Sequence, residues 1–312
     1  MKALITGGAG FIGSHLTDRL LTLGHQVRVF DNLSTGKREN LRAAGSDVEL
    51  VVGDVRDAEA LGQAARGVEL VFHLAAVVSV QRSLEHPLDT QAINLGGTLN
   101  ALVAAHRQGA RRLVLASSAA VYGSLAEGAN TEQDPTLPDS PYGLEKLASE
   151  HYLRIWQQLH GLETLSLRYF NVFGPRQDPS SPYSGVLSIF ADRMLRGVVP
   201  TIYGDGEQTR DFVYVSNIVE ANCCAGLGST TRGEFNVGCG SSTSLNQLFQ
   251  QMASALPGKL PASCAPSYAA SRAGDIRHSL ADITRARETL GYKPQVQVAE
   301  GLKLLLGALQ TG

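Results

Sequence analysis

The sequence predicts an α/β protein: a doubly wound parallel sheet followed by a smaller α+β region. Three observations lead to this prediction. Short, β-branched apolar runs alternate with segments of helical period through the first half of the chain, and a glycine-rich turn joins the first run to the first helical segment. After Arg168 the elements become shorter, and proline and serine interrupt them. We therefore expect one domain over residues 1–170 and a second over 171–312, with later segments threading back into the first.

The apolar runs of the first half are expected to be strands buried on both faces. They are Lys2–Thr6, Gln26–Phe30, Val48–Val52, Glu69–Leu74 and Leu113–Ala116. The segment Phe11–Leu23 is predicted to be an amphipathic helix, since Ile12, Leu16, Leu20 and Leu23 recur at helical spacing. Two longer helices are predicted over about Pro87–Gln108 and Tyr142–His160. Strand–helix–strand units cross over with a right hand, so the sheet should be parallel with helices on both faces.

Composition and charge exclude several classes of protein. Hydrophobic residues make up 43% of the 312 residues and charged residues 18%, which is typical of a globular chain and not of a disordered one. The net charge of −2 offers no basic surface for DNA or RNA. The sequence shows neither a membrane-spanning apolar run nor a signal peptide, so we expect a cytoplasmic protein without a membrane partner.

The four cysteines have neither metal-ligand spacing nor the spacing of a disulfide framework. They are Cys223, Cys224, Cys239 and Cys264. We interpret them as reduced thiols of the core and expect no metal site. A catalytic thiol is the alternative, but the sequence shows no activating motif beside any of them.

The glycine-rich turn Thr6–Gly13 predicts a dinucleotide site. Gly8, Gly10 and Gly13 form GxGxxG, and Gly7, Gly10 and Gly13 form GxxGxxG. Residues without a Cβ let the backbone turn tightly and approach a pyrophosphate, which then meets the positive end of the helix. Because a strand precedes the turn and an amphipathic helix follows it, the context is that of a Rossmann-type nucleotide site.

Acidic and small residues at later strand ends agree with this prediction. Asp31 ends the second strand, where its carboxylate can accept hydrogen bonds from ribose hydroxyls and would repel a 2′-phosphate, so NAD is favoured over NADP. Asp54 follows the third strand, within reach of an adenine amino group. His73–Ala76 ends the fourth strand with small residues along the expected path of the cofactor. The alternative for the last two is an ordinary strand end.

A serine, a tyrosine and a lysine form the candidate catalytic set. Ser118 follows the fifth strand, and Tyr142 and Lys146 are four residues apart on a predicted helix, so both can reach one site. A nearby ammonium group and a positive nicotinamide favour the phenolate over the phenol, which would make Tyr142 a base near neutral pH. An inward tyrosine beside a solvated lysine is the alternative, and the position of the pair after a nucleotide-binding half argues against it.

These motifs resemble those of the extended short-chain dehydrogenase/reductases, in particular the NAD-dependent nucleotide-sugar 4-epimerases. The resemblance covers nearly the whole chain. The motifs that carry it are Thr6–Gly13, Asp31-Asn32, Gly53-Asp54, His73–Ala76, Ser117-Ser118, Tyr142–Lys146, Arg168–Asn171, Gly174–Arg176 and Arg210–Val215.

The resemblance implies that NAD stays bound while C4 of the sugar is oxidised and then reduced on its other face. Tyr142 would be the base, Lys146 would tune it, and Ser118 would bind the sugar oxygen. The residues expected at NAD are Gly7, Gly10, Phe11, Ile12, Gly13, Asp31, Asn32, Asp54, Val55, Leu74, Ala75, Ala76, Tyr142, Lys146 and Tyr169. Those expected at the UDP-sugar are Ser118, Tyr142, Asn171, Arg210, Arg272, Asp275 and Ser279. From the residues alone, Arg210 beside Asp211 is read as a surface ion pair.

Departures from related families narrow the expected reaction. The related 4,6-dehydratases and UDP-glucuronate decarboxylases carry an acidic residue before their Val-Tyr-Gly, where this chain has Ala119 and Ala120. Alanine can neither donate nor accept a proton, so a dehydratase or decarboxylase is disfavoured. The resemblance also aligns Ser279 with a tyrosine of epimerases restricted to glucose and galactose. A small residue there predicts that UDP-GlcNAc and UDP-GalNAc are accepted, with or without UDP-glucose and UDP-galactose.

Several alternatives stay open at this point. A UDP-glucuronate 4-epimerase would share the motifs, and a nucleotide-sugar reductase or dehydrogenase would share the fold but exchange its cofactor. A non-catalytic NAD sensor is disfavoured because the Tyr142–Lys146 pair is intact. By family analogy we expect a homodimer that associates through the helices near Gln91–Gln108 and Tyr142–His160.

Overall fold

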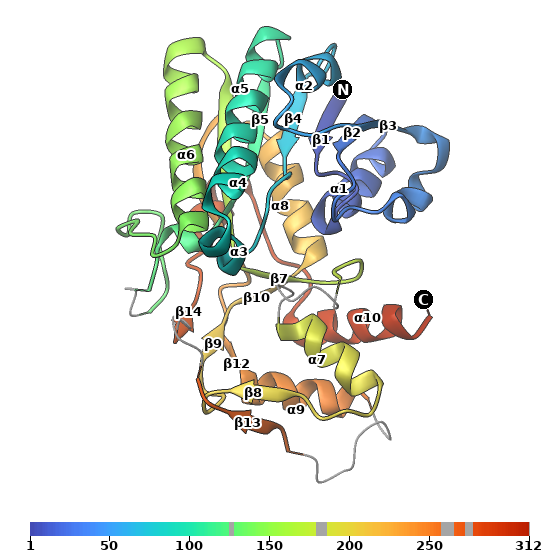
Figure 1. Ribbon diagram of the computed structural model, residues 1–312, viewed down its shortest axis with the longest axis vertical. Helices are drawn as coiled ribbons and strands as arrows, with labels where there is room; N and C mark the ends of the chain where they lie inside the picture. Colours follow the sequence, from blue (N-terminus) through green and yellow to red (C-terminus); the bar gives the residue numbers. More distant parts are fainter. Residues whose placement is uncertain (125–127, 179–185, 257–264, 272–276, 312) are drawn as a thin grey trace.

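The computed structural model describes residues 1–124, 128–178, 186–256, 265–271 and 277–311. Within these residues, a seven-stranded parallel sheet of order β11-β6-β5-β4-β1-β2-β3 forms the centre of the larger part (Figure 1). Its strands are β1 Lys2–Thr6, β2 Gln26–Asp31, β3 Val48–Val52, β4 Leu70–His73, β5 Arg112–Ser118, β6 Glu163–Tyr169 and β11 Arg232–Val237. The predicted Rossmann-type sheet is confirmed, and its strand order reverses between β1 and β4, where such sheets bind ligands.

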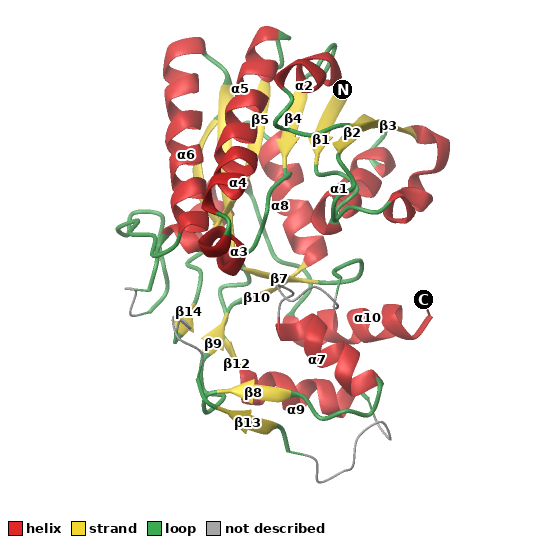
Figure 2. Cartoon of the chain, viewed as in Figure 1, coloured by secondary structure: helices red, strands yellow, loops and turns green. Residues whose placement is uncertain are grey.

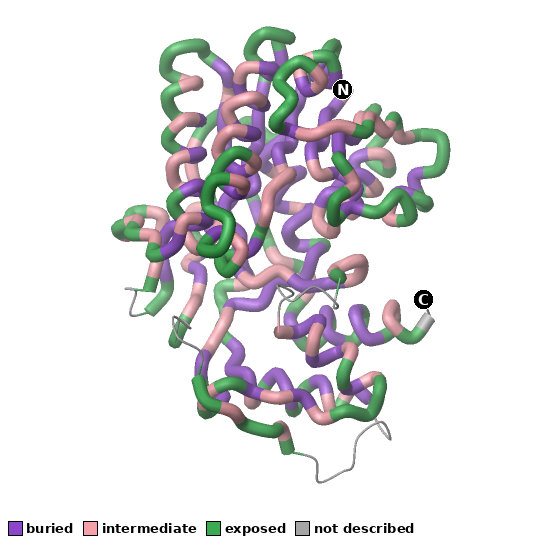
Figure 3. The backbone as a smooth tube through the Cα atoms, viewed as in Figure 1, coloured by how far each residue is buried: buried purple, intermediate pink, exposed green. Residues whose placement is uncertain are grey.

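Helices cover both faces of this sheet (Figure 2). They are α1 Phe11–Thr22, α2 Ala58–Ala64, α3 Val80–Glu85, α4 Pro87–Gln91, α5 Gly97–Arg107, α6 Pro141–His160 and α8 Val215–Leu227, with short 3-10 helices at Arg38–Asp47 and Ala119–Val121 and π turns at Ala92–Gly96 and Ala286–Leu290. Two separate apolar clusters show the layering. One contains Leu16 of α1 and Ile218 of α8, and the other contains Leu61 of α2 and Leu153 of α6. The strands are accordingly buried between helices whose outer faces are exposed (Figure 3).

The predicted helices are present in the structure, and two of them differ from the prediction in where they end or how they are built. On α1, Leu16 and Leu20 are fully buried, but the expectation for Leu23 was wrong because the helix ends at Thr22 and Leu23 is 41% exposed as its C-cap. The predicted helix over Pro87–Gln108 consists of α4, a π turn and α5 in one continuous run.

A buried arginine fastens α8 to the sheet. Arg112 at the start of β5 is 1% exposed and pairs with Glu163 of β6. Its guanidinium donates to the carbonyl oxygens of Ala225, Gly226 and Gly228 at the end of α8. These carbonyls have no intrahelical donor, so the charged side chain satisfies acceptors that burial would otherwise leave unpaired.

The second half of the chain forms the smaller α+β region and returns twice to the sheet, through α8 and β11 (Figure 1). Its elements are β7 Asn171–Phe173, α7 Val186–Leu195, β8 Thr201–Tyr203, β9 Thr209–Arg210, β10 Phe212–Tyr214, β12 Thr243–Ser244, α9 Leu245–Ala255, β13 Ser267–Ala269, β14 His278–Ser279 and α10 Val298–Thr311. A separate apolar core holds α7, α9 and α10 together through residues such as Phe190, Met252 and Leu302.

Two further observations concern the described residues alone. None of their helices is long and apolar enough to cross a membrane. Cys223, Cys224 and Cys239 are free thiols, and Cys264 lies outside the described residues.

Candidate active site

The glycine turn between β1 and α1 has the shape that a bound pyrophosphate requires. Gly7 adopts a φ of +71°, and its N–H donates to the carbonyl of Phe30 at 2.9 Å. A Cβ on Gly13 would lie 2.2 Å from the oxygen of Gly7, so only glycine fits there. Gly10 caps α1 without a side chain, which leaves the first-turn N–H groups to an anion. Phe11 and Ile12 supply two of those groups.

Asp31 holds a carboxylate at the carboxyl end of β2. It is 7% exposed and accepts the N–H groups of Ala9 at 2.9 Å and Leu33 at 2.8 Å. Two oxygens have about four lone-pair sites, so acceptor capacity remains for a ribose diol. A Cβ on Gly36 would lie 2.9 Å from both oxygens, so glycine lets the following loop close against Asp31.

Asp54 is committed to protein donors. Its carboxylate accepts from Asn32 Nδ2 at 2.9 Å, and it accepts from Arg56 through the backbone N–H, Nε and Nη2, each at 2.9 Å. These donors hold the pKa of Asp54 well below its usual range, with the Arg56 side chain as the largest cause. They use its acceptor sites, so an adenine amino group would have to displace one of them. The side chain of neighbouring Val55 is buried and packs against α5 at Gly97.

The segment after β4 passes close to the glycine turn. The N–H of Leu74 donates to the carbonyl of Thr6, and that of Ala75 donates to the Thr6 hydroxyl at 3.3 Å. A Cβ on Gly7 would meet the backbone of Ala75 at 2.7 Å. Leu74, Ala75 and Ala76 are all partly exposed, as residues beside a ligand path should be.

Ser118, Tyr142 and Lys146 meet where β5 ends and α6 begins. Ser140 caps α6 and Pro141 occupies its first turn, so the helix starts just before Tyr142. The Ser118 side chain lies near the Tyr142 hydroxyl and acts to lower the pKa of the phenol. Lys146 Nζ donates to the carbonyl of Ala116 at 2.8 Å and lies 5.9 Å from the centre of the Tyr142 ring. The predicted catalytic set is therefore brought together.

Burial shifts the pKa values of the two ionisable members in opposite directions. It raises the pKa of Tyr142 to about 12, against the opposing effect of the Ser118 side chain. It lowers the pKa of Lys146 to about 8, against the charges of Glu145 and Glu150. In the protein alone Tyr142 is thus a neutral phenol at pH 7, because desolvation dominates its pKa and the lowering by Lys146 that the sequence led us to expect is absent.

The expected substrate residues Asn171, Arg210 and Ser279 lie on adjoining short strands. Ser279 of β14 pairs in register with Arg210 of β9, and the N–H of Asn171 donates to the carbonyl of Asp211 at 3.0 Å. Tyr169, two residues before Asn171, pairs with Ser118 across β5 and β6, so this group adjoins the catalytic set. The Tyr169 hydroxyl accepts from Asn222 at 2.7 Å. Arg272 and Asp275 lie outside the described residues.

The interpretation of Arg210 and Asp211 as a surface ion pair was wrong. Asp211 is fully buried, and its carboxylate accepts the backbone N–H groups of Cys239, Gly240 and Ala281. Burial raises its pKa to about 6 despite these donors. Asp211 therefore fixes the backbone beside Arg210 and Ser279 and leaves the arginine to other partners.

Sequence reasoning missed the buried polar residues behind the catalytic pair. Glu150 of α6 forms an ion pair with Arg168 of β6 at 2.7 Å, and both side chains are almost fully buried. Arg168 also donates to the Tyr122 hydroxyl at 2.8 Å. Glu145, adjacent to Lys146, is 5% exposed. The signal in the sequence was a pair of acidic residues at positions where α6 faces the sheet.

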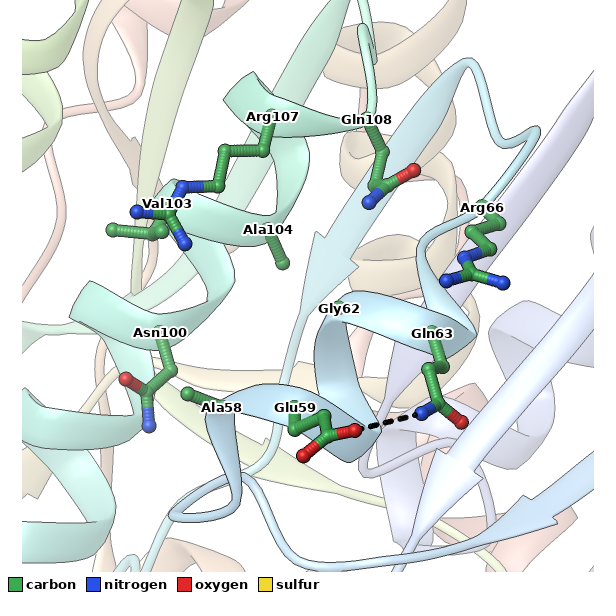
Figure 4. Close-up of a pocket in the computed structure, with 10 residues that line it drawn as sticks. All are labelled: Ala58, Glu59, Gly62, Gln63, Arg66, Asn100, Val103, Ala104, Arg107 and Gln108. Carbon is green, nitrogen blue, oxygen red and sulfur yellow. Dashed lines mark hydrogen bonds between the residues drawn. The ribbon is translucent and has the colours of Figure 1, made fainter.

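A surface hollow of about 230 Å³ lies elsewhere, between α2 and α5 (Figure 4). Glu59, Gln63, Arg66, Asn100 and Arg107 are among the residues that line it, and Gln63 donates to Glu59 at 3.3 Å. It contains none of the predicted catalytic or cofactor residues. The reacting site is therefore assigned to the strand ends and not to this hollow.

The glycine turn yields the first prediction. Gly13→Ala places a methyl group against rigid backbone, so we expect at least a roughly tenfold loss of NAD affinity, or loss of bound NAD on purification. Calorimetric titration and the NAD content of the purified protein measure this effect. Gly62→Ala is the matched control, because its Cβ would meet nothing within 4 Å. Equal NAD affinity in both variants would refute the role of the turn.

Comparisons with known proteins agree with this geometry. The model of the NAD-dependent epimerase/dehydratase family matches residues 3–238. A UDP-glucose 4-epimerase of Mycolicibacterium smegmatis is 42% identical over 306 residues, which cover 97% of this chain and 96% of that protein. The crystal structure of a Thermotoga maritima UDP-glucose 4-epimerase with UDP-glucose superposes with a TM-score of 0.93 at 39% identity, covering 100% of this chain and 99% of that one.

A second structure extends the range of sugars. The UDP-N-acetylglucosamine 4-epimerase of Methanobrevibacter ruminantium, in complex with UDP-N-acetylmuramic acid, gives a TM-score of 0.93 at 37% identity and covers 99% of this chain and 98% of that one. The family model spans more than half of the chain, and the M. smegmatis relative spans nearly all of it. This chain belongs to the NAD-dependent epimerase/dehydratase family.

Proposed function

We propose that this protein interconverts the C4 epimers of a UDP-hexose or UDP-N-acetylhexosamine by oxidising the C4 hydroxyl to a ketone and reducing it on the other face. The observation that carries the proposal is the meeting of Ser118, Tyr142 and Lys146 beside a glycine turn that fits a dinucleotide. The similarity to UDP-sugar 4-epimerases over the full length supports it.

The chain's residues fit NAD. Gly7, Gly10 and Gly13 leave the first-turn N–H groups of α1 to the pyrophosphate, and Asp31 offers acceptors to the ribose. Asn32, Val55, Leu74–Ala76 and Tyr169 would complete the site. When bound, NAD supplies the hydride acceptor and donor, and its positive ring favours the phenolate of Tyr142.

Each catalytic side chain would have a distinct task. Tyr142 would take the proton of the C4 hydroxyl and return it, and the ammonium of Lys146 would stabilise the phenolate. Ser118, whose side chain lies near the Tyr142 hydroxyl, would bind the same sugar oxygen. Asn171, Arg210 and Arg272 would hold the diphosphate, for which guanidinium groups are suited, and Asp275 would bind the nucleotide ribose. Ala119 and Ala120 carry no acid or base for elimination or decarboxylation.

The direct test incubates the purified protein with single UDP-sugars and no added cofactor. We expect the C4 epimer of the accepted sugars, and Tyr142→Phe should lower the rate roughly 10²–10⁴-fold because the base is removed. NMR or chromatography of the products measures this. A requirement for stoichiometric NAD(P)H would instead identify a reductase or dehydrogenase, and activity confined to UDP-glucuronate would identify the uronate epimerase.

Ser279 is proposed to admit an N-acetyl group. It is partly buried and pairs with Arg210, beside the proposed diphosphate site. Ser279→Tyr should lower kcat/KM for UDP-GlcNAc and UDP-GalNAc roughly tenfold or more by steric exclusion, and much less for UDP-glucose and UDP-galactose. Ser279→Ala, which adds no bulk, is the control. Equal losses for both pairs of sugars would show that residue 279 does not select the substrate.

We also propose a homodimer that associates through α4, α5 and α6. These helices lie side by side on one flank of the sheet (Figure 1). Leu88 on α4 is 81% exposed, and on α6 Leu144, Ile155 and Leu159 are 58%, 40% and 71% exposed. The three α6 residues recur at helical spacing on its outer face, so a second copy of the same flank could cover them.

Placing charge on this flank tests the dimer. Leu88→Asp combined with Leu159→Asp should convert a dimer to a monomer in sedimentation velocity, since each carboxylate would be buried without a partner. Leu304→Asp on α10, where the native side chain is 46% exposed, should leave the dimer intact. A wild-type monomer, or a dimer that survives the double substitution, would exclude this interface.

A further inference from the structure

Glu145 is a buried carboxylate in contact with neutral groups. It lies on α6 between Tyr142 and Lys146 in sequence and is 5% exposed. Its Oε1 accepts from the Thr90 hydroxyl at 2.9 Å, and its Oε2 accepts from Asn94 Nδ2 at 2.6 Å. Both donors are uncharged, so they orient the carboxylate without neutralising it.

Glu150, the other buried acid of α6, differs from Glu145 in having a cationic partner. Glu150 is paired with Arg168 at 2.7 Å, so its charge is matched locally. Among the residues that the structure describes, no lysine, arginine or histidine nitrogen lies within 4 Å of the Glu145 carboxylate. The ammonium of Lys146, on the next residue, is then the cation whose charge state this carboxylate most affects.

The fold holds Glu145 firmly in this position. Asn94 lies in the π turn between α4 and α5, and besides Glu145 it binds both backbone groups of Val77, at 2.8 and 3.1 Å. Val77 directly follows the Leu74–Ala76 segment. One amide side chain thus ties the acid of the catalytic helix to the strand end beside the proposed cofactor site, and π turns often occur at functional sites.

We propose that Glu145 is a positioning residue whose negative charge keeps Lys146 in its ammonium form and at the same time opposes the ionisation of Tyr142. This inference rests on the proposed function, since it assigns a task to Glu145 in the same reaction. On this proposal, the pH range in which the enzyme is active depends on Glu145 as well as on Tyr142 and Lys146.

Other side chains and backbone groups also face Tyr142 and Lys146. From β4, the buried His73 lies near Lys146, and burial lowers its pKa to about 3, so its ring is neutral near pH 7. From β5, Ser118 acts to lower the pKa of Tyr142, and the Ala116 carbonyl accepts a hydrogen bond from Lys146. From β6, the positive charge of Arg168 neutralises that of Glu150. From α3, the Ser83 hydroxyl accepts a hydrogen bond from the N–H of Tyr142. The charge of Glu145 raises the pKa of Lys146 and that of Tyr142.

A charge effect and a packing effect predict opposite shifts in the pKa of Lys146. Removing the charge of Glu145 lowers the pKa of Lys146 and that of Tyr142, so both limbs of the pH–rate profile move toward lower pH. Loosened packing admits water, which returns each pKa toward its ordinary value: Tyr142 falls and Lys146 rises. The limbs then move apart. The limbs report the coupled pair. The Tyr142 limb falls in both cases, so the direction of the Lys146 limb separates the two causes.

The experiment compares wild-type holoenzyme with Glu145→Gln. A glutamine fits, because its Oε1 can accept from Asn94 while its Nε2 donates to the Thr90 hydroxyl, which can turn its own proton to the carbonyl of Pro87. We expect both limbs of the kcat/KM profile to move down by about one pH unit, at the low end of the range for neighbouring charges. Thr90→Val, which removes a hydrogen bond but leaves the charge, should keep the limbs in place, and Glu145→Asp should restore them.

A second measurement does not depend on activity. With lysine labelled at 13Cε, an NMR titration gives the pKa of Lys146, assigned by its loss in Lys146→Met. We expect Glu145→Gln to lower that pKa by about one pH unit. A wild-type pKa of Lys146 below about 7 would overturn the proposal without any variant of Glu145, because the carboxylate would then fail to keep the ammonium form at neutral pH.

The outcomes separate the two proposals. Limbs that stay in place or move apart in Glu145→Gln, in a wild type that epimerises, overturn the role of Glu145 alone. A wild type without epimerase activity overturns the proposed function, while the NMR titration still decides whether Glu145 controls Lys146.

Discussion

Burial of Tyr142 and Lys146 between α6 and the end of β5 is the constraint on which the rest of the site depends. Taking both groups out of water disfavours the phenolate and the ammonium alike, which raises the pKa of Tyr142 to about 12 and lowers that of Lys146 to about 8. Proton transfer by Tyr142 near neutral pH needs a lower pKa for Tyr142 and a higher pKa for Lys146. Fixed charges must therefore supply them, and such charges act strongly because little water screens them.

The parallel sheet assembles the polar side chains of the site from distant parts of the chain. In a parallel sheet all carboxyl ends lie at one edge, so Asp31 of β2, His73 of β4, Ser118 of β5 and Tyr169 of β6 share that edge. The helix that follows β5, α6, begins at this edge and packs on the face of the sheet against β5 and β6. Glu145, Lys146 and Glu150 thereby acquire their environments from strands and helices far from them in sequence.

The second region depends on a different buried carboxylate. Asp211 joins the turn at Cys239-Gly240 to Ala281, and its backbone is bonded to Asn171 and Ser279. The strands that carry Arg210 and Ser279 are only two residues long and could not hold a register by their own ladders. Asp211, which accepts hydrogen bonds from backbone N–H groups, holds β9 and β14 at a defined position beside the sheet.

Sequence patterns alone predict the sheet, the glycine turn and the candidate set of Ser118, Tyr142 and Lys146. These are local features: strand and helix periods, glycines where a Cβ would collide, and a tyrosine and a lysine four residues apart on one helix. Tertiary structure alone decided the charge environment. The partners of Glu145, Glu150 and Asp211 lie between 18 and 70 residues away in sequence. Neither the burial of Asp211 nor the neutral state of Tyr142 at pH 7 can therefore be predicted from neighbours in sequence. Desolvation depends on everything packed around a group, and the linear order of residues does not contain that information.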